Sequence, residues 1–100
     1  MTRVYIAISF ENKDIQDIEK QRTNAVNWVH RQYRDAYILD SVTQFYFSEE
    51  NRHPLLQLAD MLEVVFASDV IVFSEDWNMS KSCRILHQVA KEYGLEALYI

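Results

Sequence analysis

The sequence contains few of the residues that break or cross-link a chain. Its 100 residues include one glycine, one proline and one cysteine. A lone cysteine, Cys83, excludes an internal disulfide. So little glycine and proline, with no repeat or low-complexity segment, leaves no long linker. Because the length also fits one domain, we expect residues 1–100 to form a single domain.

Long apolar runs and an excess of basic charge are also lacking. No run reaches the roughly 18 apolar residues that a membrane-spanning helix needs. After Met1 the sequence also lacks the basic residues and the apolar segment that make up a signal peptide. We therefore expect a cytoplasmic protein with no membrane partner. The formal net charge of −5 argues against a nucleic-acid polymer, which needs a dense basic face. A small nucleotide remains possible as a ligand, because one or two local donors suffice for it.

Short apolar runs rich in β-branched and aromatic residues predict strands. Residues 4–8 and 70–73 are nearly continuous apolar runs, which is typical of strands buried on both faces of a parallel sheet. Residues 97–100 predict a final short strand. Residues 35–47 are ambiguous, because a strand could lie either at Tyr37 and its neighbours or in the stretch around Val42. We place one strand near 41–47, followed by a polar loop at 48–53.

Three helices are predicted between these strands. Apolar residues recurring every three or four positions form one stripe over 12–34, whereas 55–66 is apolar nearly all round, as expected for a helix pressed against a sheet. The third helix is predicted at 81–93. Pro54 suits a first helical position, Ser80 an N-cap and Gly94 a C-terminal cap. The strand–helix alternation predicts an α/β, flavodoxin/Rossmann-like parallel sheet of about four strands with helices on both faces.

Ligands of such sheets bind beyond the carboxyl ends of the strands, which directs attention to the loops at 9–12 and 74–82. The second loop opens a helix, whose free N–H groups and positive dipole end suit a phosphate or sugar oxygen. Small side chains at Ser80, Ser82 and Cys83 would let a ligand approach, and Trp77 could stack on a base. The alternative is structural, with Ser80 capping the helix and Trp77 covering the edge of the sheet.

The joint spacing of several short elements resembles the nucleoside 2-deoxyribosyltransferase-like superfamily, closest to its small phage and bacterial members of unknown function. These elements are Ala67-Ser68-Asp69 with the following apolar strand, Asp76-Trp77, Ser80-Lys81-Ser82-Cys83-Arg84-Ile85-Leu86-His87, Ala90 and Tyr93-Gly94. The match covers roughly residues 54–95, with weaker support at 3–10. It implies a nucleoside or nucleotide ligand, no cofactor, and a homo-oligomer in which a neighbouring subunit helps to build the pocket.

Two positions depart from the family pattern. The glutamate nucleophile of the family falls on Leu86, and the glycine before the cysteine falls on Ser82. A leucine can neither form a glycosyl-enzyme intermediate nor act as the paired carboxylate of glycosidic cleavage. A register error of one residue would place Ile85 or His87 there, and neither is a carboxylate.

Candidate site residues follow from the loops and from the resemblance. Candidates for residual catalysis are Asp76, Asp60 and His87. Candidates for ligand binding are Tyr5, Ser9, Phe10, Asp76, Trp77, Ser80, Ser82, Cys83 and Leu86. Asp60 corresponds to a sugar-orienting aspartate of the family, whereas His87 is a type of side chain that can act as a general base. His30, His53 and His87 lack the spacing of metal ligands, so no metal is expected.

Three functions remain open at this point. The first is a nucleoside- or nucleotide-binding protein that has lost covalent glycosyl transfer. The second is an N-glycosidase or deoxyribosyltransferase that acts on nucleosides or their monophosphates through Asp76 or another carboxylate. The third is a scaffold or protein-interaction domain in which Leu86 extends the core.

Overall fold

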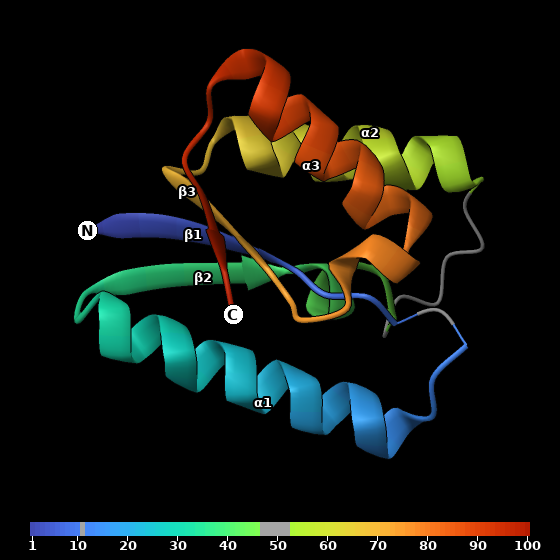
Figure 1. Ribbon diagram of the computed structural model, residues 1–100, viewed down its shortest axis with the longest axis horizontal. Coiled ribbons are helices and arrows are strands. Elements are labelled where there is room, and N and C mark those ends of the chain that lie inside the picture. Colours follow the sequence, from blue (N-terminus) through green and yellow to red (C-terminus); the bar gives the residue numbers. More distant parts are fainter. Residues whose placement is uncertain (11, 47–52) are drawn as a thin grey trace.

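The protein is an α/β fold built on a four-stranded parallel sheet (Figure 1). The computed structural model describes residues 1–10, 12–46 and 53–100. In chain order the elements are β1 (Thr2–Ala7), α1 (Ile15–Gln32), β2 (Ala36–Asp40), the π-helical turn η1 (Val42–Tyr46), α2 (Pro54–Phe66), β3 (Val70–Phe73), the 3₁₀ turn η2 (Trp77–Met79), α3 (Lys81–Tyr93) and β4 (Ala97–Tyr99). The predicted flavodoxin/Rossmann-like class is confirmed.

The strands lie in the order β2-β1-β3-β4, so β1 and β3 are central. Val4 of β1 is opposite Ile38 of β2 on one side and Val70 of β3 on the other. Every residue of β3, and β1 from Val4 onward, is buried. This confirms the prediction drawn from their continuous apolar runs, since such strands are covered on both faces.

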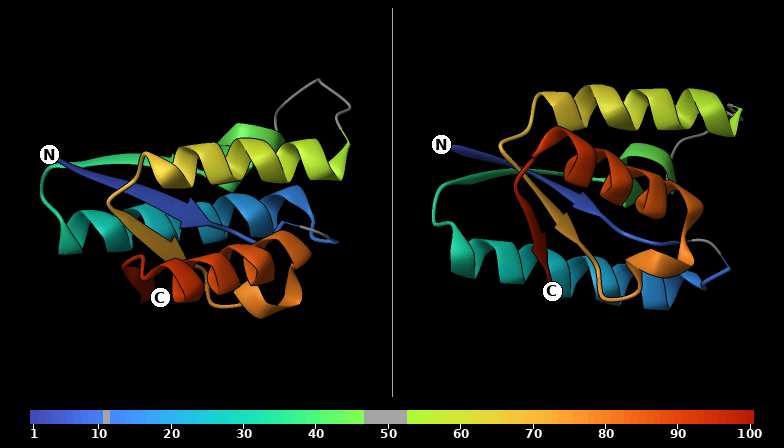
Figure 2. Two further views of the ribbon diagram at one scale, coloured as in Figure 1. Left: turned by 90° about the horizontal axis from the view of Figure 1, so that it is seen from above. Right: turned by 45° about the horizontal axis from the view of Figure 1, so that its top comes forward.

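Helices cover both faces of the sheet, with α1 on one side and α2 and α3 on the other (Figure 2). On the α1 side, Ile18 and Val29 of the helix join Ile6 and Val72 of the sheet in one buried cluster. Alternate strand residues point to the opposite face. The sheet therefore separates two apolar cores.

The second core lies between the sheet and the pair α2 and α3. Tyr5 and Phe73 of the sheet contribute to it, together with Met61 of α2 and with Leu86 and Ala90 of α3. Each of these five residues is buried. Leu86 is therefore part of the apolar packing that holds α3 on the sheet.

The predicted helix ends at Pro54, Ser80 and Gly94 agree with the structure, whereas the first helix, predicted at 12–34, is shorter and spans Ile15–Gln32. Pro54 is at the start of α2. Ser80 caps α3 by accepting a hydrogen bond from the Cys83 backbone N–H at 3.3 Å. Gly94 ends that helix in the left-handed region, with φ of 66°. These positions were predictable because each requires a particular residue chemistry.

The predicted strand near residues 41–47 is wrong, because the second strand is Ala36–Asp40 and residues 42–46 form the π-helical turn. Buried polar groups turn the chain there. The Asp40 carboxylate accepts hydrogen bonds from the Thr43 backbone N–H at 2.7 Å and from Arg22 Nε at 3.0 Å. Ser41 Oγ exchanges hydrogen bonds with the backbone of Ile8. Residues 47–52, which carry the end of that strand and most of the predicted loop, lie outside the described residues.

Candidate functional site

The carboxyl ends of β1 and β3 are adjacent and are tied together. The Ser74 backbone N–H donates to the Ala7 carbonyl at 3.1 Å, and the Ser9 backbone N–H donates to Ser74 Oγ at 3.4 Å. Both serines are buried. From β1 the chain continues toward β2 on one side, whereas β3 lies on the other, so this is the point at which the strand order switches. Open parallel sheets bind their ligands in the crevice at such a point.

A pocket of about 480 Å³ lies on the α2 and α3 side of this edge. Its lining comes from the segment after β1, from α2 as far as its third turn and from the first two turns of α3: Phe10, Pro54, Leu55, Gln57, Leu58, Met61, Lys81, Ser82 and Ile85. The volume falls within the roughly 300–1,000 Å³ of small-molecule sites. Most of the wall is apolar, and none of the described lining residues is a carboxylate.

The start of α3 makes one side of the pocket electropositive. Ser80 caps the helix and its Oγ lies 3.1 Å from Ser82 Oγ. The first turn of a helix carries backbone N–H groups with no partner inside the helix, together with the positive end of the helix dipole. Lys81 lines the pocket at this turn and adds a full positive charge. An anionic oxygen would be stabilised at this side of the pocket.

Three of the predicted ligand residues lie in the core. Cys83 and Leu86 are 0% exposed and belong to the cluster between α3 and the sheet. Tyr5 is also 0% exposed, and its hydroxyl donates a hydrogen bond to Gln44 Oε1 at 2.9 Å. Burial is the largest of the effects that raise the pKa of this phenol above its ordinary value, and nearby Cys83 and Asp40 add to it. It therefore remains a neutral donor.

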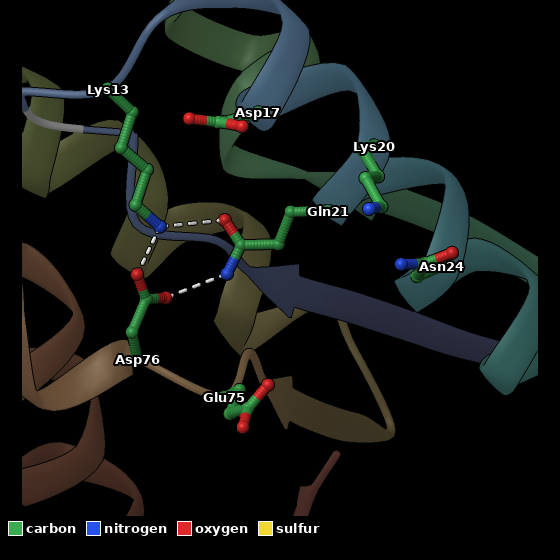
Figure 3. Close-up of a pocket in the computed structure, with 7 residues that line it drawn as sticks. All are labelled: Lys13, Asp17, Lys20, Gln21, Asn24, Glu75 and Asp76. Atoms are coloured by element: carbon green, nitrogen blue, oxygen red, sulfur yellow. Dashed lines mark hydrogen bonds and ion pairs between the residues drawn. The ribbon is translucent and has the colours of Figure 1, made fainter.

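Asp76 lies on the opposite face of the sheet, against α1 (Figure 3). Its carboxylate forms an ion pair with Lys13 and accepts a hydrogen bond from Gln21 Nε2 at 2.7 Å. The surrounding groove, of about 490 Å³, is lined by Lys13, Asp17, Lys20, Gln21, Asn24, Glu75 and Asp76. Partial burial acts to raise the pKa of Asp76, but the hydrogen bonds from Lys13 and Gln21 and the Lys13 charge outweigh it and lower the pKa. Asp76 is therefore ionised near neutral pH and is poorly suited to donate a proton.

Trp77 and His87 belong to an aromatic cluster beside β4. Their rings stack with centroids 4.0 Å apart and an interplanar angle of 20°. His87 Nε2 lies 2.6 Å from the Tyr99 hydroxyl, and Phe73 meets the His87 ring edge to face. One face of the Trp77 indole, which was predicted to stack on a base, is therefore covered by the His87 imidazole.

The candidates are thus divided among several places. Phe10 and Ser82 line the pocket, while Ser9 and Ser80 are buried and each precedes a lining residue in the chain. Asp60 lies on α2, half-buried, next to the pocket-lining Met61. Lining residues that sequence reasoning missed are Pro54, Leu55, Gln57, Leu58, Met61, Lys81 and Ile85. Of these, Lys81 could have been predicted from the sequence, because it is a cation in the first turn of the helix that follows the most apolar strand.

Among the described residues, no three His, Cys, Asp or Glu side chains are grouped so as to hold a metal ion. Within the same part of the chain, no helix is long and apolar enough to cross a bilayer. No protein-family model matches the sequence, and comparisons with curated proteins and with solved structures gave no match either.

Proposed function

We propose that this protein binds a nucleoside or nucleotide in the pocket between the first turns of α2 and α3 and does not transfer its sugar covalently. The observation that carries the proposal is the pocket itself. The pocket lies at the switch point of the sheet. Its wall is mostly apolar, and the electropositive start of α3 forms one side of it. This combination suits a ligand with a flat apolar part joined to oxygen-rich groups.

The lining offers a place for each part of such a ligand. Phe10, Leu58 and Ile85 supply apolar surface against which a base could pack. Lys81 and the first turn of α3 would receive a phosphate or a sugar hydroxyl, because a full positive charge and the positive end of the helix dipole coincide there. Gln57 and Ser82 add hydrogen-bonding groups that could fix its orientation.

The same lining argues against covalent glycosyl transfer. A nucleophilic carboxylate must reach the anomeric carbon, and none is present among the described residues that form the pocket wall. Leu86, which stands where the resembling family has its glutamate, is 0% exposed and faces the core. Ile85 lines the pocket one residue earlier, and it is equally unreactive.

Calorimetric titration with nucleosides and nucleoside monophosphates tests the proposal. We expect saturable binding of at least one monophosphate. We also expect Lys81→Ala to weaken it by about tenfold, the effect of losing one charge-assisted hydrogen bond. Lys91→Ala, in the last turn of the same helix, is the matched control and should bind normally. Absence of binding across the panel, or an equal effect of both substitutions, would contradict the proposal.

Chromatography of the same mixtures separates binding from catalysis. We expect the nucleosides and monophosphates to remain intact after prolonged incubation. Release of free base would instead establish an N-glycosidase. In that case Asp76→Asn would show whether the carboxylate on the α1 side takes part.

A further inference from the structure

Three polar side chains on the α1 side of the sheet form a closed set of contacts (Figure 3). Lys13 Nζ pairs with the Asp76 carboxylate and donates a hydrogen bond to Gln21 Oε1 at 2.8 Å. Gln21 Nε2 in turn donates to Asp76 Oδ1 at 2.7 Å. Lys13 belongs to the loop after β1, Gln21 to α1 and Asp76 to the loop after β3. We call these contacts the Asp76 clamp, because they join three separate segments of the chain.

One end of the clamp is close in sequence to the pocket wall. Lys13 follows Phe10, which lines the pocket, by only three residues. Between them the chain turns at Asn12, whose φ of 60° is a left-handed conformation that asparagine tolerates better than most residues. A displacement of Lys13 would therefore displace Phe10 as well.

The other end of the clamp is connected to the start of α3. Trp77, the residue after Asp76, stacks on His87 of α3 with ring centroids 4.0 Å apart. The turn η2 then ends at Ser80, which caps α3. These contacts hold η2 and α3 together as one unit, which carries Lys81 to the pocket wall. Asp76 immediately precedes this unit and links it to the loop after β1.

We propose that the Asp76 clamp sets the separation between Phe10 and the start of α3, so that Asp76 and Lys13 are positioning residues of the nucleotide pocket although neither lines it. The inference rests on the proposed function, since it concerns the same pocket. A nucleotide that packs its base on Phe10 and places its phosphate at Lys81 needs both walls at a fixed distance. Loops that are already ordered in the free protein lower the entropic cost of binding.

The clamp adds to the contacts that join the ends of the two strands. The Ser9 and Ser74 backbone N–H groups already fix the first residues of the two loops. The clamp joins the same loops four residues beyond Ser9 and two residues beyond Ser74. The lowered pKa of Asp76 keeps its carboxylate charged at neutral pH, so the ion pair is present under ordinary conditions.

Charge and geometry predict opposite effects of the same substitution. Asp76→Asn removes a negative charge, which by itself would favour an anionic ligand such as a nucleoside monophosphate. Loss of the clamp would instead weaken binding, because the loops would then have to be ordered by the ligand. The Lys13 and Asp76 side chains are 21% and 32% exposed, and such an ion pair contributes modestly. We therefore expect Asp76→Asn to weaken binding about threefold to fivefold.

Calorimetric titration with nucleoside monophosphates tests this sign. Glu75→Gln is the matched control, because Glu75 is the adjacent carboxylate in the same groove but takes no part in the clamp. It should bind as tightly as the unaltered chain or slightly more tightly. Lys13→Arg retains the ion pair and should bind normally. An Asp76→Asn chain that binds as tightly as Glu75→Gln would overturn the proposal.

A double variant tests whether Lys13 and Asp76 act together. We expect Lys13→Met to weaken binding as Asp76→Asn does, and the chain with both substitutions to bind no more weakly than Lys13→Met alone. Effects that multiply would mean that the two residues act independently, and they would overturn the clamp. Circular dichroism verifies that each variant is folded, and Lys13→Met replaces Asp76→Asn if the latter is not.

Hydrogen exchange of the ligand-free chain separates this inference from the proposed function. The Ile18 and Ser80 backbone N–H groups are hydrogen-bonded at the start of α1 and at the end of η2, on either side of the clamp. We expect both to exchange about threefold to fivefold faster in Asp76→Asn and at the normal rate in Glu75→Gln. Unchanged exchange would overturn the clamp, and faster exchange with unchanged affinity would overturn its role in the pocket. An unaltered chain that binds no nucleotide would refute the proposed function, while faster exchange at both positions would still support the clamp.

Discussion

Replacing Leu86 with glutamate would introduce the carboxylate that covalent glycosyl transfer requires, but it would place that carboxylate in an apolar core. Leu86 is 0% exposed and shares its cluster with Tyr5, Phe73 and Cys83. Carboxyl groups buried in this way have pKa values of about 8–9, against about 4.3 in an unfolded chain. At 1.36 kcal/mol per pKa unit, the cost reaches about 5 kcal/mol at pH 8. That cost is comparable to the roughly 5–15 kcal/mol that stabilises an ordinary domain.

Urea unfolding at pH 5 and at pH 8 measures this cost. The folded-state pKa of the introduced carboxyl group would be raised, so its penalty is small near the unfolded-state pKa and grows as the pH rises. The Leu86→Glu chain should therefore be much less stable at pH 8 than at pH 5. Ile85→Glu is the matched control, because Ile85 is 43% exposed at the pocket, and it should lose about 1 kcal/mol or less. If Leu86→Glu proves as stable at pH 8 as the unaltered chain, Leu86 does not face the core.

Three further predictions concern local contacts, and urea unfolding measures each. The lowered pKa of Asp76 means that its contacts with Lys13 stabilise the fold above the ordinary aspartate pKa and are lost as the pH falls below about 4. Asp76→Asn should therefore reduce the acid-induced loss of stability, at a cost below about 1 kcal/mol at neutral pH. Ser80→Ala should cost about 1 kcal/mol by removing the cap on the Cys83 N–H, whereas Ser80→Thr should keep most of it. Gly94→Ala should cost about 1 kcal/mol because its φ is 66°, although an added Cβ meets no atom within 4 Å.

The elements that the sequence predicted correctly are those with local signals. The run at 4–8 overlaps β1 (Thr2–Ala7), and the run at 70–73 is β3. Both strands are covered on both faces, so their apolar character is continuous and easy to recognise. Ser80 and Gly94 are caps whose chemistry is set by the adjacent backbone. In each case the relevant contacts lie within a few residues along the chain.

The second strand was misplaced because its boundary depends on distant residues. Tyr37 is half exposed on an edge strand. The sequence around Tyr37 therefore gave no clearer strand signal than the sequence around Val42. The turn that ends β2 rests on Arg22 of α1 and on the backbone of Ile8, both far away in sequence. No local pattern records such contacts.

The sequence predicted which two loops lie at the edge of the sheet, but it did not predict which side chains of those loops lie on each face. The edge beyond β1 and β3 was correctly identified as the place where polar loops meet. Whether a loop side chain faces α1 or α3 depends on its tertiary partners. Asp76 faces α1 because its carboxylate pairs with Lys13 and accepts a hydrogen bond from Gln21. Cys83, Leu86 and Ala90 follow a helical period, and this signal would have placed Cys83 and Leu86 in the core instead of among the ligand-binding candidates.

The central position of β1 has a consequence for the order of folding. Val4 pairs with Val70, so the middle of the sheet cannot close until about two-thirds of the chain has left the ribosome. Until then β1, α1 and β2 can form only a strand–helix–strand unit whose second face, with Tyr5 and Ala7, lacks the cover of α3. Contacts so distant in sequence slow folding. Truncation before β3 should therefore yield a chain that depends on chaperones rather than a stable fragment.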